Sequence, residues 1–86
     1  MKLRDADLSW QDLDEEIVVL DLGGSTYLRL NGTGATLWRR LSEGAERDDL
    51  VATLTSEYEV EASRAEQDVN AFLAQLEDKR LLDRNG

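Results

Sequence analysis

The order of hydrophobic and polar positions divides the chain into a strand half and a helix half. Up to about residue 31, apolar side chains alternate with polar ones or come in β-branched runs, which is typical of strands. After residue 33 they recur every three or four positions, which is typical of amphipathic helices. A block of strands followed by a block of helices indicates an α+β domain rather than alternating α/β units.

A β-hairpin is the clearest feature of the strand half. The apolar run 17–22 precedes Gly23-Gly24 and the alternating run 25–30 follows, and glycine tolerates the positive φ of tight turns. We predict a third strand at 8–13, joined to the hairpin by the acidic turn 14–16. One face of run 25–30 carries Thr26, Leu28 and Leu30, and the other carries Tyr27 and Arg29.

Three helices are predicted in the second half. Thr33 is a good N-cap for the first, which ends before Gly44; the second begins near Arg47, and Ser63 opens the third with an S-x-x-E capping box. The apolar stripes are Leu37, Trp38 and Leu41, then Leu50, Val51 and Leu54, then Ala65, Val69, Phe72, Leu73 and Leu76. We expect the helices to cover one face of the sheet, with the third long enough to lie across it. The predicted fold is α+β and winged-helix-turn-helix-like, with an N-terminal antiparallel sheet of three strands followed by three helices.

Length and composition limit the chemistry that this fold can carry. Eighty-six residues are enough for one small domain, spanning 1–86, with a thin core. The sequence has no cysteine and no histidine, which excludes disulfides, Cys/His zinc sites and any imidazole base. Asp21 alone stands in an apolar segment, and beside a turn its usual role is to hydrogen-bond the turn. We expect no enzyme activity, no metal and no cofactor.

The charge balance argues against nucleic-acid and membrane partners. Nineteen acidic residues against ten basic ones give a net charge of −9. Binding to phosphates needs clustered Lys and Arg, whereas only Arg39-Arg40 and Lys79-Arg80 are adjacent here. No apolar run has the length of a membrane span and no signal peptide opens the chain, so we expect a cytoplasmic protein.

Two short motifs resemble ligand loops only superficially. The acidic run 12–16 lacks the glycine and the bidentate Glu that a calcium loop places at its sixth and twelfth positions. The run 31–34 leads into a helix, as a phosphate loop does, but no Lys-Ser/Thr pair follows. We interpret the first as a solvated acidic turn and the second as a strand-to-helix corner.

Binding is the remaining function, and the strand at 25–30 is its best candidate. If the strands are added in sequence order, this strand is the last and lies at an edge of the sheet. An extended peptide can pair with the main chain of such an edge, yet many edges are merely protected, here by shortness and by Arg29. The residues alone leave these two interpretations open.

An ordered set of motif residues favours peptide binding over a merely protected edge. The set comprises Tyr27, Leu30, Asn31, Thr33, Gly34, Leu37 and Trp38, followed by Glu43-Gly44, Tyr58-x-Val60, Asp68-Val69, Phe72-Leu73 and Leu81-Leu82. Over residues 16–82 the sequence resembles the PqqD-like family. The resemblance implies a RiPP recognition element, a winged-helix-like module that binds the leader of a ribosomally made precursor peptide.

The same resemblance implies partners. A discrete chain of this kind is similar to the leader-binding proteins of lasso-peptide biosynthesis, which pass the precursor to a leader peptidase and a cyclase. Leaders of that class carry a Tyr-x-x-Pro-x-Leu-like segment. Family members in pyrroloquinoline quinone synthesis instead act as peptide chaperones for a radical enzyme, which is the alternative here. An open strand edge would also allow a homodimer.

In such modules the leader adds antiparallel to the third strand and lies between that strand and the third helix. Carried onto this chain, the leader-binding residues are Ser25, Thr26, Tyr27, Leu28, Arg29 and Leu30 on the strand, and Asp68, Val69, Phe72, Gln75 and Leu76 on the helix. For each apolar residue, plain core packing is the competing interpretation, because a thin core needs its large side chains. Phe72 and Leu28 are the better candidates for leader contact, whereas Trp38 is expected to be structural.

Two other functions compete with leader binding. A winged-helix DNA-binding protein would need a basic recognition helix, but residues 64–77 hold one basic and three acidic residues. A structural subunit of a larger synthase would have its edge strand filled permanently by a fixed partner.

Overall fold

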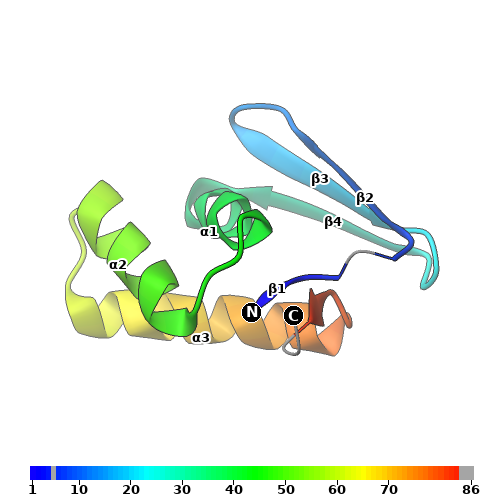
Figure 1. Cartoon of the computed structure of the whole chain (residues 1–86). Coiled ribbons are helices and arrows are strands. Elements are labelled where there is room, and N and C mark those ends of the chain that lie inside the picture. The colour runs from blue at the N-terminus through cyan, green and yellow to red at the C-terminus, as the bar shows by residue number, and fades with distance from the viewer. Residues whose placement is uncertain (5, 84–86) are drawn as a thin grey trace.

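The computed structural model describes residues 1–4 and 6–83, which form a sheet, three helices and a pair of short terminal strands (Figure 1). The elements are β1 (Lys2–Leu3), β2 (Leu8–Asp12), β3 (Glu16–Asp21), β4 (Thr26–Asn31), α1 (Gly32–Ser42), α2 (Arg47–Glu57), α3 (Ala62–Asp78) and β5 (Leu82–Asp83). The α+β fold class, the three N-terminal antiparallel strands and the three following helices are confirmed.

The main sheet is an antiparallel meander in the order β2-β3-β4. Val19 lies opposite Leu28 and Ile17 lies opposite Leu30, so their side chains share the inner face. On the outer face Leu20 lies opposite Tyr27. The predicted alternation is confirmed: Leu28 and Leu30 are buried, whereas Tyr27 is exposed. β4 is an edge strand, as the sequence order predicted.

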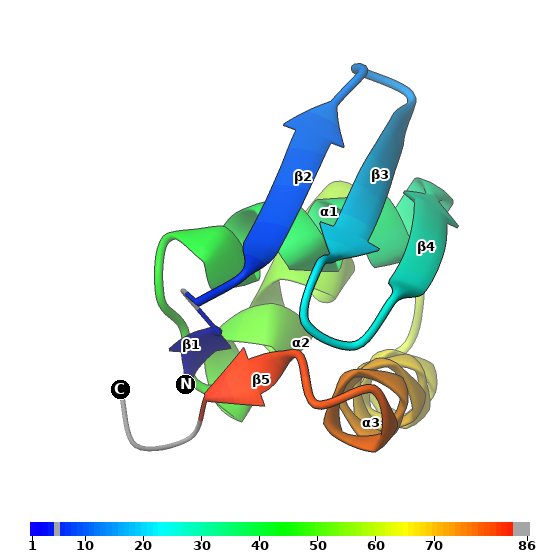
Figure 2. The same cartoon turned by 90° about the vertical axis from the view of Figure 1, so that its right-hand side faces the viewer.

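The helices form two layers beneath the sheet instead of one. α1 packs closely against β3 and β4, while α3 packs mainly against α2 and also contacts β5 (Figures 1 and 2). The expectation that all three helices cover the sheet is therefore wrong, because α3, although long enough to lie across the sheet, packs mainly against α2. Gly32 takes a positive φ of 54° at the corner after β4, and this sharp turn sends α1 straight under the sheet.

One core cluster joins the sheet to all three helices. Trp38 of α1 is fully buried, as expected of a structural residue, and its ring meets Trp10 of β2 edge-on with centroids 5.9 Å apart. The predicted stripe of α3 is confirmed, since all five of its residues are buried: Ala65, Val69, Phe72, Leu73 and Leu76. In α2, Leu50 and Leu54 are buried, whereas Val51 is only partly covered.

The predicted helix starts need correction. α1 begins at Gly32 and α3 begins at Ala62, so neither Thr33 nor Ser63 is an N-cap. Instead, the reciprocal arrangement of a capping box occurs at α2, where the Asp49 carboxylate accepts the backbone N–H of Glu46 at 2.9 Å. The predicted stop of the first helix is confirmed, because Gly44 follows it with a positive φ of 85°.

The two ends of the chain pair with each other, which sequence reasoning did not predict. β1 and β5 form a small antiparallel sheet in which Leu3 lies opposite Leu82. The backbone N–H of Arg4 extends the pairing by donating to the Leu81 carbonyl at 2.9 Å. No helix within the described ranges is both long and apolar enough to cross a membrane.

The acidic turn between β2 and β3 is neutralised by an arginine from α1. Arg39 donates to both carboxylate oxygens of Asp12, at 2.7 and 2.9 Å, and to the Asp14 carbonyl. These hydrogen bonds lower the pKa of Asp12 and raise the pKa of Arg39. Among the described residues no group of three or more acidic side chains is arranged to hold a metal ion.

Candidate functional site

The open edge of β4 is the first part of the candidate site. Within residues 1–4 and 6–83, β4 pairs with β3 only, so every second residue directs its N–H and C=O away from the sheet. Five of the six predicted strand residues lie in β4. Ser25 does not, because it belongs to the preceding turn, where its φ is +57°, and Asn31 takes its place at the other end of the strand.

The apolar residues that were predicted for the site, on β4 and on α3, differ in how completely they are covered. Leu28 and Leu30 each keep 7% of their surface, and Phe72 keeps 5%. Val69 and Leu76 keep none, so both serve the core and present no surface to a groove. Leu28, Leu30 and Phe72 thus keep some accessible apolar surface, and contact of Leu28 and Phe72 with a leader stays a prediction.

One face of α3 continues past Phe72 as a mixed stripe. Asp68, Phe72 and Gln75 stand at positions i, i+4 and i+7, and Lys79 follows at i+11. Gln75 is exposed and Asp68 is partly exposed, with its carboxylate 3.3 Å from Nε of Arg64. Asp68 and Gln75 thus share a solvent-accessible face of α3, which Lys79 continues, and their role at the rim of a leader site stays a prediction.

On the outer face of the sheet, β4 carries an exposed aromatic ring and a paired cation. Tyr27 is 57% exposed and lies opposite Leu20, itself 43% exposed. Arg29 binds Glu16 on β3 through two hydrogen bonds, the shorter of 2.6 Å, and this raises the pKa of Arg29. Arg29 therefore belongs to a cross-strand ion pair and lies on the face away from the helices.

A buried ion pair fixes the turn at the beginning of β4. Asp21 is almost completely buried; its carboxylate accepts from Arg4 and from the backbone N–H groups of Gly23 and Gly24, at 3.1 and 3.2 Å. The hydrogen bond from Arg4 is the main reason why the pKa of Asp21 is lowered, against the opposing effect of burial. The role predicted for Asp21, hydrogen bonding to its turn, is confirmed.

A polar cavity of about 480 Å³ lies between this turn and the end of α3. Its walls come from the N-terminal segment, the β3–β4 turn, the first residue of β4 and the end of α3, which lie close together in Figure 2. We call it the turn cavity; its lining includes Arg4, Gly24, Thr26, Asp78, Lys79 and Arg80. Sequence reasoning missed it because only the fold brings residue 4 beside residue 80, and the one available signal was the adjacent pair Lys79-Arg80.

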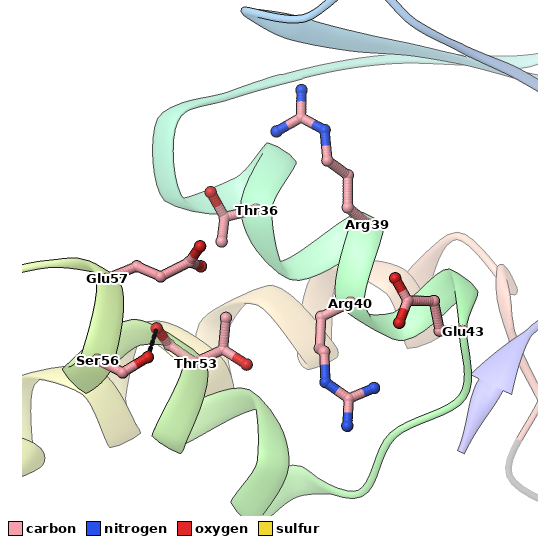
Figure 3. Close-up of a pocket in the computed structure, with 7 residues that line it drawn as sticks. All are labelled: Thr36, Arg39, Arg40, Glu43, Thr53, Ser56 and Glu57. Atoms are coloured by element: carbon pink, nitrogen blue, oxygen red, sulfur yellow. Dashed lines mark hydrogen bonds between the residues drawn. The ribbon is translucent and has the colours of Figure 1, made fainter.

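A second pocket, of about 380 Å³, opens between α1 and α2 (Figure 3). It is lined by Thr36, Arg39, Arg40, Glu43, Thr53, Ser56 and Glu57. Both of its cations are engaged elsewhere: Arg39 with Asp12, and Arg40 with the Gly44 carbonyl at 2.8 Å. The Ser56 hydroxyl donates to the Thr53 carbonyl rather than to a base. The hydrogen bond of Ser56 therefore involves no base, and none of the lining residues of this pocket belongs to β4.

Comparison with known proteins connects this geometry with a family. The model of the family described as coenzyme PQQ synthesis protein D (PqqD) matches residues 16–82, the range over which the sequence resembled it. A comparison with the curated proteins finds no significant match.

Two solved structures are similar over almost the whole chain. One, described as "TbiB1 in Complex with the TbiA(beta) Leader Peptide", is 32% identical with a TM-score of 0.90, and the match covers 100% of this chain and 99% of that one. The other, "Lasso peptide synthetase B1 complexed with the leader peptide", is 36% identical with a TM-score of 0.80 and covers 93% of each chain. On the family match and these likenesses, the chain belongs to the PqqD family.

Proposed function

We propose that this protein binds the leader of a ribosomally synthesised precursor peptide by strand addition to β4, as a step of lasso-peptide biosynthesis. The observation that carries the proposal is the open edge of β4, whose first residue, Thr26, lines one cavity together with residues at the end of α3. Both similar structures are complexes with a leader peptide, and one is a lasso-peptide synthetase component. The resemblance of the sequence to RiPP recognition elements supports the same function.

The physics of an edge strand explains how such binding would work. Unpaired N–H and C=O groups fix the register of an extended guest, while side chains beside the edge recognise alternate residues of the guest. Leu28 and Phe72 supply small apolar surfaces there, and Asp68 and Gln75 supply polar ones. A free leader is disordered, so the cost of ordering it limits the affinity and favours reversible binding.

The role is proposed to be carriage rather than catalysis. A bound leader holds the attached precursor at a high local concentration beside enzymes that also bind this protein. We infer that these enzymes are a leader peptidase and a cyclase. The alternative, a radical enzyme, is favoured by the name of the family that the chain matches, whereas the lasso-peptide neighbours favour the peptidase and cyclase.

Peptide titration tests the proposal directly. The probe is a fluorescein-labelled synthetic peptide with a Tyr-x-x-Pro-x-Leu segment, followed by fluorescence anisotropy and by amide chemical shifts of the ¹⁵N-labelled protein. Saturable binding with the largest shifts in residues 26–31 is the expected result. Absence of binding, or shifts confined to the α1–α2 pocket, would overturn the proposal.

Main-chain pairing can be separated from side-chain contact by N-methylation of the probe. In an antiparallel pair only alternate residues donate an N–H to the partner strand. Methyl groups on one alternate set of peptide nitrogens should abolish binding, and those on the other set should have little effect. Because N-methylation leaves every side chain of the probe unchanged, the comparison reports on the main chain alone. An equal loss of affinity for both sets, or no loss for either, would contradict strand addition.

A further inference from the structure

The turn cavity has the position and charge of a subsite for the leader. Resting on the proposed function, we propose that it takes an acidic side chain of the leader, located just after the segment that pairs with β4. The carboxylate would lie between Lys79 and Arg80 at the end of α3 and the turn that opens β4. This would give the leader site a charge preference in addition to its apolar contacts.

The direction of strand addition assigns the cavity to one end of the guest. β4 runs from Thr26 to Asn31, and the sheet that contains it is antiparallel throughout. A guest that continues this arrangement has its C-terminal end beside Thr26, which is the residue of β4 that lines the turn cavity. The residues that follow the paired segment therefore enter the cavity, and the segment that precedes it leaves at the opposite end.

Two of the three cations that line the cavity, Lys79 and Arg80, differ from the arginines that the structure describes in ion pairs. Six arginines lie within 4.0 Å of a carboxylate, among them Arg64 with Asp68 and also Arg4, which lines the cavity and pairs with Asp21. Lys79 and Arg80 have no such ion pair with any residue that the structure describes. In a chain of net charge −9, two unpaired cations on one cavity form a local site for an anion.

The position of Arg80 is held by the rest of the cavity. Arg4 donates to the Arg80 carbonyl at 2.9 Å while its other terminal nitrogen binds Asp21. Arg80 has a φ of +58°, so its backbone is fixed in a conformation that places it outside the helix. Gly24 completes the wall, since a Cβ there would lie 2.7 Å from the Asp21 carboxylate. These contacts preorganise the cavity before any guest arrives.

The balance of charge favours a carboxylate over a cation. Arg4 already neutralises Asp21, so among the lining residues Lys79 and Arg80 stand against one further carboxylate, that of Asp78, while the Asp7 carboxylate lies beside Gly23 at the margin. A cavity of about 480 Å³ has ample room for an Asp or Glu side chain. A Lys at the same place in the guest would meet both unpaired cations and would weaken binding.

Matched peptides provide the test. Probes with the Tyr-x-x-Pro-x-Leu segment carry Glu, Gln or Lys at each of the four following positions, and their Kd values are measured by anisotropy. At one position Glu should bind about three- to fivefold more tightly than Gln, and Lys more weakly than Gln. The preference for Glu should be lost in K79Q/R80Q and should shrink in 1 M NaCl.

A control removes equal charge elsewhere. R40Q/R47Q loses two cations from α1 and α2, outside the cavity, and should keep the preference for Glu at the same position. Circular dichroism confirms that both double variants are folded. If all probes bind equally at every position, or if R40Q/R47Q loses the preference as fully as K79Q/R80Q, the cavity proposal is wrong although leader binding stands. If no probe binds at all, the proposed function itself fails.

Discussion

At the scale of single residues, Asp21 shows how one carboxylate holds three parts of the chain. It joins the N-terminal segment through Arg4 and its own turn through Gly23 and Gly24. Arg4 in turn reaches the Arg80 carbonyl after α3. Its burial alone would suggest a reactive acid, but three donors favour the charged form. Asp21 is therefore structural, and it shapes the cavity without being free to bind a ligand.

The pH dependence of stability should report this ion pair. The pKa of Asp21 is lowered in the folded protein from a reference value of 3.8, so the unfolded chain binds the proton more readily. The stabilisation that the Asp21 carboxylate contributes is complete at pH values above its unfolded-state pKa. It is lost as the pH falls through its pKa in the folded protein. The urea midpoint should therefore decrease below about pH 4.

Asp21→Asn isolates that contribution. The variant should be less stable than the parent at pH 6.5 and should lose less on going to pH 3, because no proton is taken up at position 21. Asp48→Asn is the control, since its side chain is 98% exposed and should leave the difference between the two pH values unchanged. If the Asp21 variant loses as much stability at pH 3 as the parent does, other carboxylates cause the loss of stability in acid.

Phe72 illustrates a residue with two roles. It is 5% exposed and belongs to the core cluster, yet it stands between Asp68 and Gln75 on the face of α3 that is proposed to contact the leader. Truncation to Ala would cost about 3–5 kcal/mol and confuse the two roles. Phe72→Leu keeps most of the volume and should cost less than about 1.5 kcal/mol.

Phe72→Leu should weaken binding of the Tyr-x-x-Pro-x-Leu probe about fivefold, because an aromatic contact is lost at the groove. Leu54→Val serves as the control, as it should destabilise the core by about 1 kcal/mol from α2 without touching the edge of β4. Equal affinity for parent and Phe72→Leu would assign Phe72 to the core alone.

At the scale of elements, Gly34 in α1 and Gly44 just after it show whether a position needs glycine for its backbone conformation. Gly44, just after α1, has a φ of +85°, whereas Gly34 in its first turn does not have a positive φ. A Cβ on Gly34 would meet the nearest atom, Cδ2 of Leu30, at 3.5 Å, an ordinary van der Waals distance. Of these two positions, only 44 therefore has a backbone conformation that favours glycine.

Alanine substitution should move stability in opposite directions at these two positions. Gly44→Ala should lower the free energy of unfolding by about 1–2 kcal/mol, because a Cβ disfavours the left-handed conformation. Gly34→Ala should raise it by about 0.5–1 kcal/mol through helix propensity. Urea unfolding checks both, and a loss of stability in Gly34→Ala would show that the corner after β4 needs more room than its distances indicate.

Periodicity predicts elements well when they are long and expose only one face. Run 25–30 and the stripe of α3 meet that condition, and both were located within a residue or two. β1 and β5 have two residues each, too few for any pattern, and they form only because the fold brings the chain ends together. The capping signals failed for a related reason: Thr33 and Ser63 suit an N-cap, but the corner at Gly32 and packing of α3 set the actual helix starts.

The candidate site likewise has parts that the sequence pattern predicts and parts that depend on the tertiary fold. The strand and helix that form it follow from pattern, whereas the turn cavity depends on Arg4 meeting Asp21 and Arg80 across the whole sequence. Sequence reasoning also assigned Val69 and Leu76 to the groove, and their complete burial reserves them for the core. Helical periodicity predicts the face of the helix on which a residue lies but not how completely it is buried, because burial depends on how the neighbouring helices pack against it.

At the scale of the whole molecule, the open edge of β4 would suit a second copy as well as a leader. Two chains of net charge −9 repel each other, and this repulsion weakens as salt shortens the screening length from about 30 Å at 0.01 M to about 3 Å at 1 M. We therefore expect the free protein to be monomeric in low salt and to form some dimer in 1 M NaCl.

Sedimentation velocity in the presence of the probe identifies the surface that such a dimer uses. If two copies pair through β4, a saturating Tyr-x-x-Pro-x-Leu probe should return the protein to monomer in 1 M NaCl, because the guest strand and the second copy compete for one set of main-chain groups. The alternate N-methylated probe that does not bind β4 should leave the dimer intact. A dimer that persists under saturating probe must use another surface, and the exposed pair Leu20 and Tyr27 on the outer face of the sheet is then where to look first, because that face remains open when β4 is occupied.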